Sequence, residues 1–182
     1  KKVRHLSMKH GKKIQFWGDI IRHYPELIKD IPSDVTVLDW GYTHDHPFDR
    51  IKDLKKVGLP FYACPGTSGW VTLFNRIPEA MANIAGFAAA GCKHGAQGLL
   101  NTDWGDGGHY NFMEYSWHGY LFGAEQGWNT KAKTDTFTTR FAKLFFNTDD
   151  RALADAVTAL GDVAQTAGWG YQSIWRHVYF AG

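Results

Sequence analysis

The chain has 182 residues, of which 44% are hydrophobic and 21% charged, a composition that is typical of one globular unit and excludes a disordered or fibrous segment. Twenty Lys and Arg residues against eighteen Asp and Glu residues leave a net charge of +2. Because the basic residues are scattered, the charge pattern indicates neither a nucleic-acid partner nor an anionic membrane surface.

Four short apolar runs recur in the first 106 residues, and a turn and a stretch with helical spacing follow most of them. The runs cover 12–19, 35–42, 59–67 and 96–106, and the helical stretches between them cover 23–31, 47–58 and 77–95. Strands that alternate with helices in this way predict parallel βα units. The runs are apolar on both faces, which is typical of a parallel sheet covered on both sides. Residues 1–11 resemble a helix that ends at Gly11.

After residue 112 the pattern changes to successive helices, predicted over 113–128, 134–146 and 151–168. The order is therefore a helix, four βα units and a helical tail. A (β/α)₈ barrel takes about 250 residues, so this order predicts an α/β fold: the C-terminal half of a (β/α)₈ TIM barrel over 1–128, with a helical extension packed on it over 129–182. An open doubly wound sheet is the alternative, but the first turn, FWGDIIRHYPE, lacks the glycine-rich phosphate loop of such folds.

An aromatic residue stands near the end of each apolar run, beside polar or acidic groups. The groups at these ends are Trp17 with Asp19, Asp39 with Trp40, Tyr62 with Cys64, and Trp104 with Asp103 and Asp106. In a parallel barrel, catalytic and binding groups lie where strands end and loops begin. Three indoles and a phenol at one mouth form an apolar wall, and carboxylates among them accept hydrogen bonds from hydroxyls. This combination predicts a pocket for a single sugar ring.

Structural roles compete with these assignments. A Trp in a βα loop can fill space under a helix, and only the repetition at four strand ends favours a ligand wall. Asp19 and Asp45 are both suitable helix N-caps, and Asp106 stands ahead of two glycines, as turn residues often do.

Histidines and cysteines give only weak patterns. His44 and His46 would need a third ligand, and a metal-dependent barrel hydrolase that uses His44, His46, His109 and nearby Asp residues is a minor alternative. No metal or other cofactor is predicted. Cys64 and Cys92 are compatible with one disulfide or with two thiols.

Four segments, in their order and spacing, resemble the second half of the barrel of glycoside hydrolase family 20, the β-N-acetylhexosaminidases. They read FWGDII, VTVLDWGY, FYACPGTSGW and GLLNTDWGDGGH, and the last two are similar to the branch related to hexosaminidase D. The resemblance spans 1–128. It implies a barrel that binds a terminal N-acetylglucosamine or N-acetylgalactosamine. It also implies a retaining, substrate-assisted mechanism, in which the acetamido oxygen of the sugar attacks the anomeric carbon.

The resemblance also implies roles for single residues. Trp17 and Trp40 match the indoles that enclose the acetamido methyl group. Tyr62 falls near the family tyrosine whose hydroxyl binds the acetamido oxygen, although YACPG replaces the usual Tyr-x-Asp. Trp70 competes for a nearby surface.

Trp104 and Asp106 match the family's Trp-x-Glu pair, in which the indole lies under the sugar ring and the carboxylate accepts from its hydroxyls. Asp19 occupies a position that the family often fills with an acid. The family's adjacent Asp-Glu pair, which includes the general acid, has no match, because no Asp-Glu dipeptide occurs in the chain.

The sequence therefore predicts a glycoside hydrolase that removes terminal β-linked N-acetylhexosamine. In this interpretation the chain supplies the sugar-binding wall, and a missing N-terminal half-barrel, upstream or in a companion chain, supplies the acid pair. The alternative is a carbohydrate-binding half barrel without catalysis that pairs with a copy of itself, since open sheet edges favour such pairing.

Overall fold

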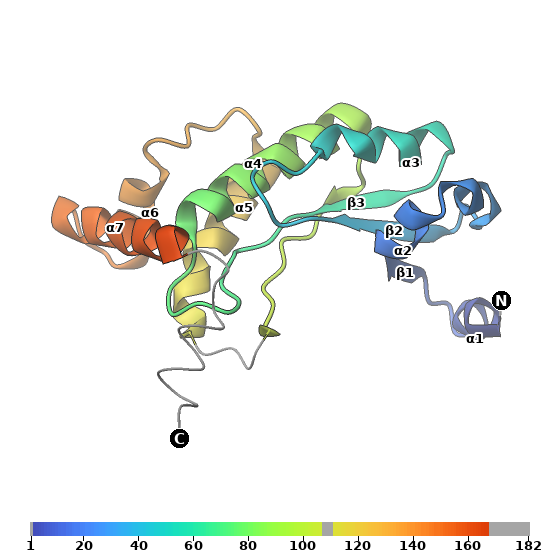
Figure 1. Cartoon of the computed structure of the whole chain (residues 1–182), viewed down its shortest axis with the longest axis horizontal. Coiled ribbons are helices and arrows are strands. Elements are labelled where there is room, and N and C mark those ends of the chain that lie inside the picture. Colours follow the sequence, from blue (N-terminus) through green and yellow to red (C-terminus); the bar gives the residue numbers. More distant parts are fainter. Residues whose placement is uncertain (1, 107–110, 168–182) are drawn as a thin grey trace, which may run out of the picture.

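The computed structural model describes residues 2–106 and 111–167 (Figure 1). Its centre is a four-stranded sheet whose strands are all parallel. In spatial order they are β1 (Ile14–Trp17), β2 (Val35–Trp40), β3 (Phe61–Cys64) and β4 (Gly98–Leu99). Each strand lies beside its predecessor in the chain, so the predicted α/β class and the four parallel strands are confirmed.

The helices follow the predicted order, but the stretches predicted over 47–58 and 113–128 each begin with a 3₁₀ helix, and the stretch over 23–31 differs most. They are α1 (Lys2–Lys9), α2 (Asp19–His23), η1 (Pro25–Asp30), η2 (Phe48–Ile51), α3 (Lys52–Lys56), α4 (Ile77–His94), η4 (Met113–Ser116), α5 (Trp117–Trp128), α6 (Phe137–Phe145) and α7 (Arg151–Ala167). The helix expected over 23–31 is instead the short α2 followed by the 3₁₀ helix η1. Pro25 separates the two because its nitrogen cannot donate a hydrogen bond to the preceding turn.

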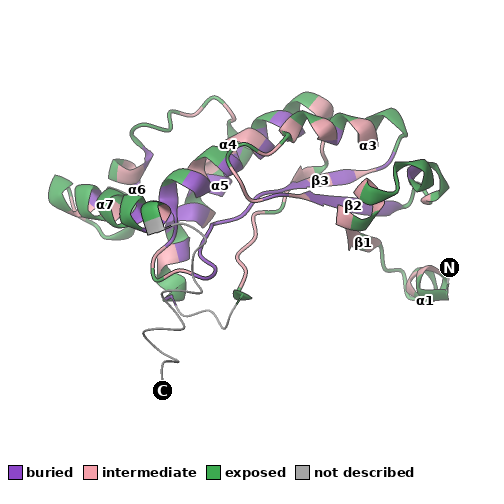
Figure 2. Ribbon diagram, viewed as in Figure 1, coloured by how far each residue is buried: buried purple, intermediate pink, exposed green. Residues whose placement is uncertain are grey.

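One face of the sheet packs against helices. Val37, Phe61 and Ala63 are at most 2% exposed and belong to one core with Phe87 of α4 and Leu54 of α3. Figure 2 shows this buried layer in β2 and β3 beneath α3 and α4. Because successive side chains in a strand point to opposite faces, the residues that alternate with these lie on the other face of the sheet.

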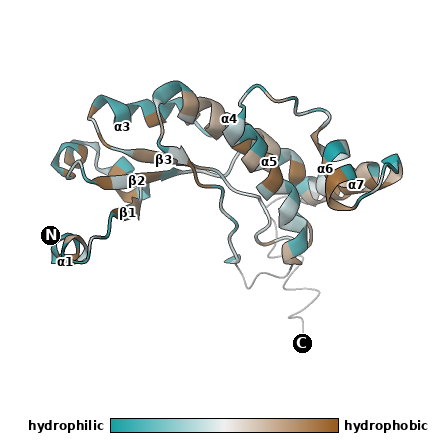
Figure 3. Ribbon diagram, turned by 180° about the vertical axis from the view of Figure 1, so that it is seen from behind, coloured by the Kyte–Doolittle hydropathy of each residue, from teal (hydrophilic) through white to brown (hydrophobic). Residues whose placement is uncertain are grey.

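The long helix α4 connects this core to a second one. Its C-terminus is closed by Gly95, whose φ of 78° is left-handed. On its other flank, Ile84 packs with Phe122 of α5 and with Phe137 and Phe141 of α6. The helical tail therefore packs on α4, and the apolar stripes of its helices are visible from behind in Figure 3.

The sheet ends in two edge strands. Among the described residues, β1 pairs only with β2 and β4 pairs only with β3. An unpaired edge presents free backbone N–H and C=O groups that can pair with a further strand. No helix in the described part of the chain is long and apolar enough to cross a membrane.

Candidate functional site

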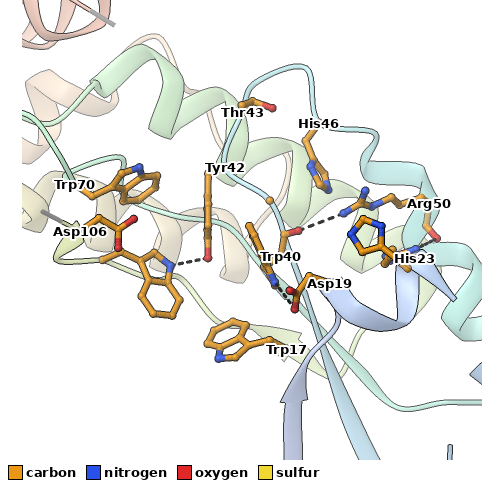
Figure 4. A pocket seen from close by; sticks show the side chains of 13 residues that line it. Trp17, Asp19, His23, Trp40, Tyr42, Thr43, His46, Arg50, Trp70 and Asp106 are labelled. Carbon is orange, nitrogen blue, oxygen red and sulfur yellow. Dashed lines mark hydrogen bonds between the residues drawn. The ribbon is translucent and has the colours of Figure 1, made fainter. Parts of the chain in front are cut away.

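A cavity of about 860 Å³ lies at the carboxyl ends of the strands (Figure 4). Six of the seven residues predicted for the site line it. The complete lining consists of Trp17, Asp19, Arg22, His23, Trp40, Gly41, Tyr42, Thr43, His46, Arg50, Trp70, Trp104 and Asp106. The lining comes from the end of β1 with α2, from the end of β2 with the following loop and η2, and from the loops after β3 and β4. A parallel sheet brings these strand ends to one edge.

The aromatic side chains of the cavity form one connected cluster. The rings of Trp17 and Trp104 lie 5.3 Å apart at 58°. Trp40 stacks on Tyr42 at 4.9 Å and 25°, and the edge of Trp70 meets Tyr42 at 4.9 Å. The indole Nε1 of Trp104 donates a hydrogen bond of 2.6 Å to Tyr42 Oη and joins the two parts. The cluster therefore presents a continuous aromatic wall.

Tyr62 is the exception among the predicted site residues, and the sheet register explains why. Tyr62 pairs with Leu38, whereas Cys64 pairs with Trp40. Tyr62 consequently lies one layer deeper in the sheet than the strand ends, and it does not line the cavity. Its ring leans over β4, where a Cβ on Gly98 would come within 2.6 Å of it. The phenol that does line the cavity is Tyr42.

Tyr42 is held as a neutral phenol. Burial raises its pKa to about 12, outweighing the hydrogen bonds from its neighbours. The oxygen accepts the Trp104 N–H, and a phenol keeps its own proton to donate elsewhere. Thr102 also lies within hydrogen-bonding range of the Tyr42 hydroxyl, so a ligand oxygen that accepts from Tyr42 would share or replace this contact.

The acids at the strand ends have three different environments. Asp19 begins α2 without capping it through its side chain, and its Oδ1 accepts a long hydrogen bond of 3.4 Å from Trp40 Nε1. Asp106 is exposed at the cavity. Asp103 accepts from Thr67 Oγ1 at 2.5 Å, outside the cavity lining. Asp19 and Asp106 are thus placed to accept from hydroxyl groups, and Asp103 secures the loop after β3.

The opposite side of the cavity is basic. In Figure 4, Tyr42 and Trp70 stand on one side of Trp40, and His23, His46 and Arg50 on the other. Arg22 Nε donates to the buried Asp39 Oδ1 at 2.9 Å, and Arg50 Nη2 donates to the Trp40 carbonyl at 3.4 Å.

These contacts fix the end of β2. Burial, with the nearby charges of Arg50 and Arg22, lowers the pKa of His46 to about 4, so this imidazole is neutral at physiological pH.

Trp70 lies behind the wall. Its side chain is only 1% exposed, so it supports the Tyr42 ring and offers little surface to a ligand. The loop that carries it contains two residues with positive φ, Ser68 at 56° and Val71 at 47°. A β-branched residue rarely adopts this conformation. Arg76 holds the loop by donating from Nη2 to the Trp70 carbonyl at 3.1 Å.

The histidines considered as metal ligands do not converge. His44 Nδ1 lies 2.9 Å from Glu79 Oε2, whereas the His46 ring packs against Phe48 and Phe87, and His109 lies outside the described residues. Within 2–106 and 111–167 no three His, Cys, Asp or Glu side chains gather closely enough to hold a metal ion.

The two cysteines are free thiols. Cys64 is buried and Cys92 is exposed. Burial raises the pKa of Cys64 to about 12, so this side chain remains a protonated thiol that packs in the interior below the cavity.

Comparison of the sequence with protein-family models gives no match, and comparison with curated proteins gives none either. The function must therefore be inferred from the residues and the geometry of the cavity.

Seven residues of the lining were not among the predicted sugar-binding residues: Arg22, His23, Gly41, Tyr42, Thr43, His46 and Arg50. Tyr42 lies two residues after Trp40, at the end of β2. The expectation that functional residues lie at strand ends could have identified it. Arg22 and Arg50 lie in helices, and no strand-end pattern points to them.

Proposed function

We propose that this chain forms the sugar-binding wall of a glycoside hydrolase that removes terminal β-linked N-acetylhexosamine, similar to the family 20 β-N-acetylhexosaminidases. One observation carries the proposal: a connected wall of indoles and one phenol, with Asp19 and Asp106 beside it, surrounds one cavity at the carboxyl ends of four parallel strands. Flat apolar faces with nearby carboxylates suit the apolar and hydroxyl faces of a pyranose ring.

In this proposal, each side chain has a role in holding the sugar. The Trp104 indole lies under the ring, and Asp106 accepts from its hydroxyls. Trp17 and Trp40 enclose the acetamido methyl group. Tyr42, which lines the cavity where Tyr62 does not, donates a hydrogen bond from its hydroxyl to the acetamido oxygen.

The reaction would be retaining and substrate-assisted. The acetamido oxygen attacks the anomeric carbon, the bond from that carbon to the leaving-group oxygen breaks, and a general acid protonates that oxygen. The Tyr42 hydroxyl would orient the acetamido oxygen for its attack on the anomeric carbon. The general acid would come from an Asp-Glu pair in the other half of the barrel, because the chain contains no such dipeptide.

The proposed other half would pair with both sheet edges. β1 and β4 each have one neighbour among the described residues, and closure of a (β/α)₈ barrel needs a strand beside each. A second copy of this chain fits less well. Helix α1 precedes β1 and α5 follows β4. If β4 of one copy paired with β1 of another, α5 of the first copy and α1 of the second would both cover that pair of strands, whereas a (β/α)₈ barrel has one helix there.

The test is an assay of the protein expressed from its native reading frame with a chromogenic β-N-acetylglucosaminide and a β-glucoside. Cleavage of the first alone, inhibited by a thiazoline mimic of the intermediate, is the expected result. A protein that cleaves neither compound and does not bind the thiazoline would overturn the proposal. Binding of N-acetylglucosamine without cleavage, by a stable dimer, would favour the carbohydrate-binding alternative.

A further inference from the structure

Helix α4 carries two buried polar side chains that face the cavity loops. Glu79 is 4% exposed and Asn83 is 0% exposed, and they stand four residues apart, on one face of the helix. Burying a carboxylate and an amide is unfavourable unless hydrogen bonds compensate. The partners of these two side chains therefore indicate what they are for.

Asn83 uses its amide to join two loops. Nδ2 donates to the carbonyl oxygens of Gly41 at 3.1 Å and Thr43 at 3.0 Å. These two residues flank Tyr42 in the loop after β2. Oδ1 accepts from the backbone N–H of Gly66 at 3.1 Å, in the loop after β3. One side chain thus fixes both loops at the same point of α4.

The Gly66 end of this bridge also reaches the aromatic wall. A Cβ at Gly66 would lie 2.8 Å from the Trp70 ring and 3.0 Å from the Tyr42 ring. The backbone held by Asn83 is therefore in close contact with both rings. A shift of this loop would move the support behind Tyr42.

Glu79 holds the next residues of the same loop. Its Oε1 accepts from the His44 backbone N–H at 2.6 Å, and its Oε2 lies 2.9 Å from His44 Nδ1. Gln165 of α7 donates to Oε2 at 3.0 Å. The loop after β2 is thereby attached to α4 on both sides of Tyr42.

We propose that Asn83, assisted by Glu79, is the positioning residue of the cavity: it holds Tyr42 in the cavity lining, where its hydroxyl meets Trp104 Nε1. The importance of this placement for sugar binding rests on the proposed function, but the placement itself does not. Asn83 touches no ligand and acts only through the loops.

The test follows the Trp104 indole N–H in Asn83→Ala by ¹H–¹⁵N NMR, with the resonance assigned from Trp104→Phe. Loss of the bridge is expected to raise solvent exchange of this N–H by about tenfold or more, since two donated and one accepted hydrogen bond are lost together. The resonance should also move upfield. Ile84→Val is the matched control, because Ile84 neighbours Asn83 but packs in the second core, and it should leave the resonance unchanged.

The outcomes separate this proposal from the proposed function. An unchanged Trp104 N–H in folded Asn83→Ala overturns the positioning role, whatever the protein binds. A shifted N–H in a protein that binds no N-acetylhexosamine supports the positioning role and removes only the function. If Asn83→Ala does not fold, Glu79→Gln provides the same readout: it is expected to raise exchange severalfold, and an unchanged exchange rate in it would overturn the proposal.

Discussion

Trp104 and Tyr42 stand 62 residues apart in the chain and meet through one hydrogen bond of 2.6 Å. Each ring also touches a second indole, Trp17 for the first and Trp40 for the second. Rings that support one another in this way lose little freedom when a ligand binds, so the wall is preorganised. The two side chains make different contributions, since Trp104 offers a face and Tyr42 offers a donor, but their direct hydrogen bond couples them.

Replacing Trp104 with Ala should weaken binding of N-acetylglucosamine by about 5- to 150-fold, the effect of losing about 1–3 kcal/mol with a stacked aromatic anchor. Titration followed by NMR or calorimetry measures this. Trp117→Ala is the control, since Trp117 is 44% exposed on α5 and does not line the cavity. Equal losses in the two variants would contradict a sugar platform at Trp104.

Replacing Tyr42 with Phe keeps the ring and removes both the hydroxyl donor and the oxygen that accepts the Trp104 N–H. Affinity for N-acetylglucosamine should fall by about 2- to 10-fold, the effect of one hydrogen bond of about 0.5–1.5 kcal/mol. Tyr62→Phe should leave affinity unchanged, because Tyr62 lies outside the cavity. The affinities of the two variants for N-acetylglucosamine, measured by the same titration, decide which tyrosine binds the sugar. A larger loss in Tyr62→Phe would assign to Tyr62 the contact with the acetamido oxygen that the resemblance implied.

Strand ends could be located from the sequence, and this is why Trp17, Trp40 and Trp104 were predicted to share an opening. The choice between Tyr62 and Tyr42 could not be made in the same way. It depends on register, which sets Cys64 rather than Tyr62 beside Trp40. A shift of two residues along a strand keeps the face but changes the depth, and apolar patterns do not encode depth.

At the level of elements, α5 and α6 are joined through a buried histidine. His118 is 2% exposed and lies edge-on to Phe137 and Phe141, each at 5.1 Å. Its Nε2 lies 3.0 Å from Thr138 Oγ1. Burial lowers the pKa of His118 from 6.5 to about 4, so the folded protein holds this imidazole neutral.

The position of this pKa predicts a loss of stability in acid. As the pH falls below 6.5, the unfolded chain takes up the proton first, so the free energy of unfolding decreases until the folded form is also protonated near pH 4. The contribution of His118 is on the order of 2–3 kcal/mol. Urea unfolding at pH 7 and pH 4.5 measures it.

His118→Phe is the comparison for this measurement. In this variant the free energy of unfolding should fall less between pH 7 and pH 4.5, by most of that amount. The carboxylates that also titrate in this range are present in both proteins, so they do not contribute to the comparison. An identical pH dependence in wild type and variant would show that His118 does not contribute.

Elements could be predicted where a periodic hydrophobic pattern continued over a long segment, and not where the segment was short. Helix α4 has Pro near its start and Gly95 at its end, and the structure places its boundaries within one residue of 77–95. By contrast, Pro25 divides the helix expected over 23–31. β4 is only two residues long, although the chain stays beside the segment after β3 as far as Thr102, which forms an isolated parallel bridge with Gly66.

For the whole molecule, the proposed barrel depends on the outer edge of β1. Gly18 N–H donates to Leu38 of β2, and alternation along the strand points the Gln15 N–H to the open edge. Gln15→Pro would remove that donor without breaking a bond to β2. In the native protein, if it carries the proposed other half, this change should cost about 1–3 kcal/mol.

The same substitution in the isolated chain is the control, and there it should have little effect. Thermal unfolding of the wild type and Gln15→Pro, each in the native protein and in the isolated chain, measures the difference in stability. Equal losses in both contexts would mean that no strand pairs with the outer edge of β1.

The position of Tyr62 over Gly98 has a consequence for how a glycan would enter and leave the cavity of the proposed barrel. Leu38 pairs with Tyr62 in the sheet, and in the proposed barrel these two side chains would fill the interior below the aromatic rings, so the cavity would be closed at its base. A glycan could then present only its outermost unit, and the freed monosaccharide would have to leave by the way it came before the next chain end arrived.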